Sequence, residues 1–137
     1  MRRPLIISLA ATAFVALLAA GGIAVAGAAA VPPTKTVAIT GSACPGQKAY
    51  CFKSAALTVA RNTKVVWKNL SVAPHTVTRC SVALCGVTGG TGKDVNFRSP
   101  EFNPGKTYTY TFHKPGTYRY FCKVHGYPDM HATITVR

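Results

Sequence analysis

The segment YFCKVHGYPDMHATITV, residues 120–136, places three metal-binding side chains close together near the end of the chain. Cys122 is followed by His125 three positions later and by Met130 five positions after that. A thiolate and a thioether favour Cu(I), whereas an imidazole suits both oxidation states of copper. The spacing therefore predicts a copper site, with zinc as an alternative because cysteine and histidine also bind zinc.

Short strands must position these residues, because the chain after the first thirty residues shows alternating patterns rich in β-branched and aromatic residues. Gly, Pro and Asn at the turn positions separate most of them. An all-β sandwich follows. We expect residues 80–105 to form a long loop connection with room for a short helix, and Trp67 to be a core residue. The predicted strands are residues 35–40, 56–60, 63–68, 75–79, 106–112, 116–122 and 130–136.

A fourth metal ligand is available from a distant part of the chain, because His75 stands at the start of a predicted strand and a sandwich brings strand ends together. Two imidazoles, one thiolate and one thioether form the set typical of a trigonal electron-transfer copper site with a weak axial methionine. We expect His113 and His131 to be ordinary surface residues. His113 lies in a turn, and strand alternation directs His131 to the face opposite Met130.

Five cysteines leave one without a partner if the others form disulfides. Cys44 and Cys51 bracket one short segment, and Cys80 and Cys85 bracket another, so we favour these two local pairs, with Cys122 left as the free thiol. Four cysteines allow three connectivities, and the sequence does not exclude the crossed ones.

At these residues the chain resembles the cupredoxins, and most closely the plastocyanin-like type 1 (blue) copper proteins. The resemblance spans roughly residues 35–137 and depends on VVWKNLSVAPHTVT, NPGKTYTYTFHKPGTYRYFC and the Cys122-x-x-His125-x-x-x-x-Met130 spacing. It implies a Greek-key β-sandwich of about eight strands with one copper ion per chain. The implied ligands are His75, Cys122, His125 and Met130, and the implied activity is single-electron transfer without chemistry on a substrate.

The chain departs from plastocyanins beside the ligands. Thr76 follows the first histidine where plastocyanins commonly have Asn, and Val124 precedes the second where they have Pro. The segment Tyr127-Pro128-Asp129 and the two cysteine pairs are also unlike plastocyanin. Because groups around the ligands tune a metal, these changes bear on the reduction potential.

The first thirty residues read as a signal peptide, with two arginines, a charge-free apolar stretch and small residues at its end. An uncleaved membrane anchor is the alternative, since residues 5–31 are long enough to span a bilayer. We therefore expect a copper-binding domain over residues 31–137 in an exported protein. Its location would be periplasmic, extracellular or at the cell surface, with the anchored form included.

The charge of the exported part points to an acidic partner. Without Arg2 and Arg3, fourteen basic residues face three acidic ones, which gives a net charge of +11. The basic residues are scattered and match no nucleic-acid motif. The expected partner is therefore an acidic protein, and an anionic membrane surface is the second possibility. We expect a monomer whose redox partner docks near His125, Tyr127 and Pro128.

An electron carrier is the first functional hypothesis, and a copper chaperone or storage protein outside the cytoplasm is the second. We expect no enzyme activity. A copper enzyme of this type needs a second copper centre, and the chain has four histidines and no His-Cys-His tripeptide. The triplet Asn69-Leu70-Ser71 fits a glycosylation sequon, and we assign it no role.

Overall fold

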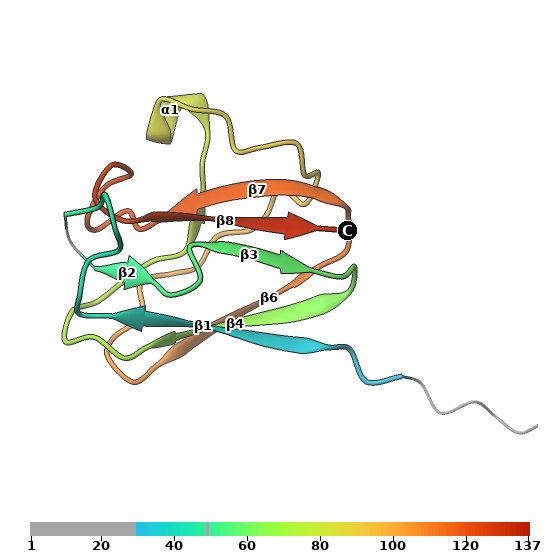
Figure 1. The fold of residues 1–137 in the computed structure, drawn as a ribbon, viewed down its shortest axis with the longest axis horizontal. Helices are drawn as coiled ribbons and strands as arrows, with labels where there is room; N and C mark the ends of the chain where they lie inside the picture. Colours follow the sequence, from blue (N-terminus) through green and yellow to red (C-terminus); the bar gives the residue numbers. More distant parts are fainter. Residues whose placement is uncertain (1–29, 49) are drawn as a thin grey trace, which may run out of the picture.

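Two four-stranded sheets pack face to face in this computed structural model, which describes residues 30–48 and 50–137 (Figure 1). One sheet has the order β2 (Cys51–Phe52), β1 (Thr34–Thr40), β4 (Thr63–Asn69) and β6 (Thr107–Phe112). The other has the order β3 (Ala56–Val59), β8 (His131–Val136), β7 (Gly116–Phe121) and β5 (Thr78–Arg79). The predicted all-β Greek-key sandwich of about eight strands is confirmed.

The predicted signal peptide or membrane anchor over residues 1–30 lies outside the described residues, apart from Ala30. In the described part of the chain, no helix is long and apolar enough to cross a membrane.

Two pairs of neighbouring strands are parallel, β1 with β4 and β3 with β8, and the remaining pairs are antiparallel. Parallel pairing places the ends of β1 and β4 at the same end of the molecule, where β7 also ends and β8 begins (Figure 1). The segments that carry the predicted ligands leave the sheets at this end.

Trp67 occupies the centre of the core, as predicted, and is completely buried. It is an inward-facing residue of β4, and its ring packs against Phe97, Tyr108 and Tyr120 at centroid distances of 5.5, 5.5 and 5.7 Å. The indole N–H donates to the Tyr120 hydroxyl at 3.2 Å, so this buried polar group is satisfied. Tyr120 precedes Cys122 by two residues, and the core therefore fixes the end of β7 beside the site.

The predicted strand at residues 75–79 is reduced to Thr78–Arg79. Its backbone donors have other partners: His75 pairs with Phe102 in an isolated bridge, the Thr76 N–H points to the sulfur of Cys122, and the Val77 N–H donates to the Ser99 hydroxyl. The N–H groups of Thr76 and Val77 therefore donate to the Cys122 sulfur and the Ser99 hydroxyl instead of to a neighbouring strand. Strand β2, which has two residues, was missed by the sequence pattern. The short helix α1 (Val82–Cys85) lies within the predicted long connection.

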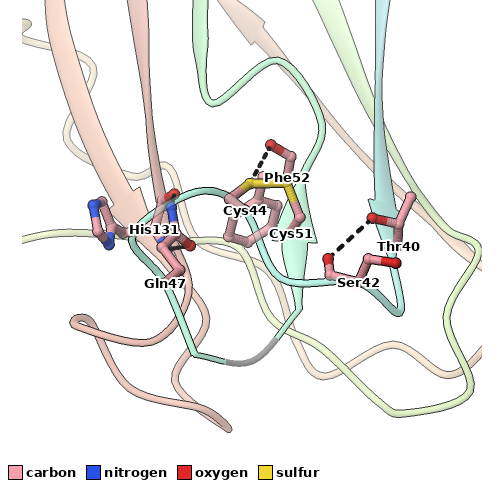
Figure 2. The surroundings of a disulfide bond; sticks show 7 residues. All are labelled: Thr40, Ser42, Cys44, Gln47, Cys51, Phe52 and His131. Carbon is pink, nitrogen blue, oxygen red and sulfur yellow. Dashed lines mark hydrogen bonds between the residues drawn. A yellow bond between two sulfur atoms is a disulfide. The ribbon is translucent and has the colours of Figure 1, made fainter.

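Both predicted disulfides are confirmed. Cys44 is bonded to Cys51 and Cys80 to Cys85, with Cα atoms 4.7 and 5.5 Å apart, and Cys122 is free and buried. Figure 2 shows the first bond at the base of a loop that leads from β1 into β2.

Candidate metal centre

Three predicted ligands meet at the end of the sandwich. The candidate donor atoms of His75, Cys122 and His125 all lie within 4.8 Å of one another. His75 and Cys122 are completely buried, and His125 is half-buried. His75 comes from the segment after β4, whereas the other two follow β7, so the group joins the two sheets.

The spacing of these atoms fits a metal ion. The Cys122 Sγ lies 3.6 Å from Nδ1 of His75 and 3.4 Å from Nδ1 of His125. A metal–nitrogen bond of about 2.0–2.1 Å and a metal–sulfur bond of about 2.3 Å, meeting at an angle between tetrahedral and trigonal, separate nitrogen from sulfur by roughly 3.5–3.8 Å, close to the two distances found here. A soft thiolate with two imidazoles is a donor set suited to copper.

The loop from Cys122 to Met130 is held in a compact form by its own backbone. The Cys122 N–H donates to the Met130 carbonyl at 3.0 Å, the Gly126 N–H to the Cys122 carbonyl at 2.9 Å, and the Met130 N–H to the Gly126 carbonyl at 3.1 Å. Gly126 has φ +85°, a left-handed conformation that suits glycine. The Met130 side chain is completely buried in the same core cluster as Cys122. Its role as the axial ligand stays a prediction.

The outer nitrogen of His75 has a serine partner. Ser71 Oγ lies 2.7 Å from Nε2 of His75, and the Ser71 hydroxyl donates to Asn69 Oδ1 at 2.8 Å. Because the hydroxyl proton is directed to Asn69, we assign the proton on His75 to Nε2, which then donates to Ser71. Nδ1 keeps its lone pair and faces Cys122. Asn69 is itself fixed, since its amide donates to the carbonyls of Ala73 and Phe102.

Thr76 contacts the sulfur of Cys122. Its N–H donates to Sγ at 3.3 Å, and its hydroxyl oxygen lies 4.0 Å from the same atom. The hydroxyl oxygen also accepts the N–H of Lys123 at 2.8 Å, which ties the two ligand segments together. The residue that replaces the usual plastocyanin Asn is thus placed where it can tune the thiolate.

Burial disfavours the charged form of both imidazoles. Desolvation by burial and, second, the neighbouring His125 lower the pKa of His75 from 6.5 to about 4. Burial also lowers the pKa of His125, against the opposing effect of Asp129. The neutral imidazole is the form that binds a metal.

His113 and His131 lie outside this group, as predicted. The His113 ring is exposed, and its Nδ1 lies 3.2 Å from Asn62 Oδ1. His131 is on the outward-facing side of β8, where its Nδ1 lies 2.8 Å from the Tyr127 carbonyl.

Apolar side chains are exposed in both ligand-bearing segments. Leu70 and Val72 are 57% and 89% exposed in the segment before His75, and Val124 is 45% exposed beside His125. Pro128 is also exposed, and Tyr127 is half-buried. These apolar side chains lie in the same segments as the exposed Lys123 and the half-buried Asp129.

Comparison with known proteins supports the same assignment. Residues 41–137 match the copper binding proteins of the plastocyanin/azurin family. A plastocyanin from Scenedesmus fuscus is 30% identical over 89 residues, which make up 65% of this chain and 89% of that protein.

Solved structures share the fold. A purple cupredoxin from Nitrosopumilus maritimus has a TM-score of 0.53 and 24% identity, over 74% of this chain and 99% of that chain. A reduced amicyanin mutant has a TM-score of 0.56 and 22% identity, over 79% and 86% of the two chains. A copper-containing nitrite reductase from Thermus scotoductus has a TM-score of 0.56 and 26% identity, over 81% of this chain but 24% of the reductase.

A two-sheet sandwich with a Cys-His-His group at one end defines a cupredoxin. The chain belongs to the plastocyanin/azurin family of copper-binding, electron-carrying proteins, and its cofactor is a copper ion.

Sequence reasoning missed the residues that support the ligands. Asn69 and Ser71 form the triplet to which we assigned no role, although Ser71 lies four residues before His75 and a hydroxyl at that distance is a usable signal. Tyr50 is a second missed residue: its ring packs against both His75 and His125. Nothing in the local sequence indicates this contact.

Proposed function

We propose that this protein is an exported type 1 blue copper protein that carries single electrons, with His75, Cys122, His125 and Met130 as ligands. The observation that carries the proposal is the convergence of one buried thiol and two imidazoles at the end of the β-sandwich. When bound, copper supplies a Cu(II)/Cu(I) couple at this position.

The chain's own residues keep the site in one geometry. The Ser71 and Asn69 hydrogen bonds fix the His75 ring, and the backbone bonds of the Cys122–Met130 loop fix the other segment. A site whose ligands cannot move far gives up or accepts an electron with little rearrangement. The buried core beneath it excludes water, whereas the half-buried His125 ring provides a short path to the surface.

Copper storage or delivery is the second candidate. Proteins that exchange copper need an open site from which the metal can leave, but the His75 and Cys122 side chains are completely buried. This enclosure favours retention of the metal and transfer of electrons. We propose that the protein is not an enzyme, because a copper enzyme of this type needs a second copper centre. The described residues form one Cys-His-His group, and the whole chain has four histidines.

A docking surface around His125 fits a transient redox partner. Tyr127, Pro128 and Val124 supply uncharged surface near the ring, and the net charge of +11 on residues 31–137 would attract an acidic protein. Redox encounters of this kind bury less than about 1,200 Å², so the partner can leave after transfer. We propose that residues 31–137 act as a monomer outside the cytoplasm, after removal of residues 1–30 or anchored through them.

An absorption spectrum of the copper-loaded protein tests the proposal. We expect one copper per chain and an intense blue thiolate-to-copper band, which Cys122→Ser abolishes while the β-sheet circular dichroism is kept. Cys80→Ser/Cys85→Ser is the control, because it removes two sulfurs that are not ligands. Copper binding without the band in the correctly oxidised protein would show that the site is not type 1.

A further inference from the structure

The loop closed by Cys44 and Cys51 reaches the two imidazoles through Tyr50. The Tyr50 ring lies 4.7 Å from the ring of His75 in an edge-on arrangement and 4.5 Å from the ring of His125. The two imidazoles are themselves 4.9 Å apart. Tyr50 thus completes a cluster of three rings, each in contact with the other two.

The same loop reaches the strand after Met130 through Gln47. The Gln47 side-chain amide donates to the His131 carbonyl at 3.0 Å and accepts the His131 N–H at 3.0 Å. This reciprocal pair takes the place of a backbone partner at the first residue of β8, and Figure 2 shows the two residues side by side. Gln47 therefore holds the backbone directly next to the predicted axial ligand.

The base of the loop is fixed to the sandwich. The disulfide joins its two ends, and Cys51 and Phe52 pair with Thr40 and Ile39 of β1. The Phe52 ring packs on Tyr120 at 4.8 Å within the core. Tyr50 and Gln47 consequently project from a support that is anchored independently of the ligand segments.

We propose that Gln47 and Tyr50, between the disulfide-bonded Cys44 and Cys51, are positioning residues of the copper site. Tyr50 fixes the planes of both imidazoles and covers the approach to Cys122, while Gln47 fixes the start of β8 next to Met130. Aromatic pairs of this kind add stability beyond the area that they bury, and two such contacts act on the same pair of rings. The inference deepens the proposed function, and its copper measurements rest on that function.

The first test uses the metal-free protein, because Cys122 is the single free cysteine. Its reaction rate with a chromogenic thiol reagent reports how often the ring cluster opens. We expect Tyr50→Ala to raise the rate about tenfold, as the loss of roughly one good aromatic contact would do. Tyr50→Phe, which keeps the ring, should react at close to the wild-type rate.

The disulfides supply matched variants for the same assay. Cys44→Ser/Cys51→Ser releases the loop and should accelerate the reaction, whereas Cys80→Ser/Cys85→Ser removes a disulfide of similar size elsewhere and should not. Both variants keep Cys122 as their one thiol. Equal rates in the two double variants, or in Tyr50→Ala and Tyr50→Phe, would overturn the proposal.

The second test uses copper and separates this inference from the proposed function. Tyr50→Ala and Gln47→Ala should each shift the thiolate-to-copper band and the reduction potential, and Tyr50→Phe should leave the band in place. An unchanged band and potential in both alanine variants would overturn the positioning role while leaving the carrier function intact. A wild-type protein without the band would refute the carrier function, and the thiol assay would still decide whether the loop covers Cys122.

Discussion

Ser71 holds one nitrogen of the predicted ligand His75 and leaves the other nitrogen facing Cys122. Its hydroxyl lies between Nε2 of His75 and the amide oxygen of Asn69, and all three residues are buried. Metal-bound histidines usually donate their second N–H to such a partner, which fixes the tautomer and the ring orientation. Here a side chain four residues earlier does this, so the segment between β4 and the ligand is part of the site.

Replacing Ser71 tests this role. We expect Ser71→Ala to weaken copper binding by about 10- to 100-fold, the usual range for loss of such a partner. The physical reason is that the His75 N–H is then buried without an acceptor, and the ring can rotate. Competition titration against a copper chelator measures the change. Ser71→Thr keeps the hydroxyl and is the control; equal affinities for the Ala and Thr variants would show that the hydroxyl does not orient the ligand.

The grouping of His75, Cys122 and His125 could be predicted from the sequence, but the residues around them could not. The spacing of Cys122, His125 and Met130 is local, and few other side chains can do their chemistry. Ser71 and Tyr50 are common residue types whose roles depend on where the chain folds. Tyr50 lies 75 positions before His125, and no sequence pattern joins residues across that distance.

The connection after α1 is packed onto β7 by its glycines. An added Cβ at Gly90 would overlap the Thr117 carbonyl, and one at Gly92 would overlap the ring of Tyr118. Arg79 donates to the Gly92 and Asp94 carbonyls at 2.6 and 2.7 Å, and its guanidinium lies 5.3 Å from the centre of the Tyr118 ring. The run Gly89-Gly90-Thr91-Gly92 is therefore a close-packed segment rather than a loose loop.

Gly92→Ala should destabilise the fold by about 1–3 kcal/mol, since the new methyl group must displace a completely buried tyrosine ring. Urea unfolding followed by circular dichroism measures the loss. Gly41→Ala is the matched control, because nothing lies within 4 Å of its added Cβ, and it should change the stability by no more than about 0.5 kcal/mol. Equal midpoints for the two variants would contradict this account of the packing.

Most strands could be predicted because alternation and turn residues are local signals. Strand β4 shows this directly, since Val65 and Trp67 are buried and Lys64 and Lys68 are exposed. Residues 75–77 could not be predicted in the same way. Their sequence favours a strand, but the N–H groups of His75, Thr76 and Val77 donate to the Phe102 carbonyl, the Cys122 sulfur and the Ser99 hydroxyl. These contacts are set by the tertiary fold.

The whole molecule combines a strong positive charge with exposed apolar side chains in the segments that carry the predicted ligands. Fourteen basic and three acidic residues lie in residues 31–137. In the proposed encounter, long-range attraction would raise the rate at which an acidic partner arrives, and a small apolar contact would allow the partner to leave.

Salt and one substitution test this arrangement. The rate of oxidation by an acidic partner should fall steeply as ionic strength rises, because salt screens attraction over about 8–10 Å near 0.1–0.15 M. Tyr127→Glu should slow transfer further at every salt concentration without removing copper. Stopped-flow absorbance measures both, with Thr34→Glu as the control, because it makes the same change of one charge unit at an exposed residue outside the docking surface. Rates that do not depend on salt and are equal for Tyr127→Glu and Thr34→Glu would show that the electron leaves the protein elsewhere.

The order of the elements along the chain also determines when the site can form. Both disulfides join cysteines five or seven positions apart, and both precede Cys122. If the chain is exported N-terminus first, these two disulfides can form before Cys122 is exported. Cys122 then encounters no unpaired cysteine of its own chain. The loop around it closes only when β8, the last strand, pairs with β7 and β3. The complete geometry of the site is therefore available to copper only after the last strand has paired.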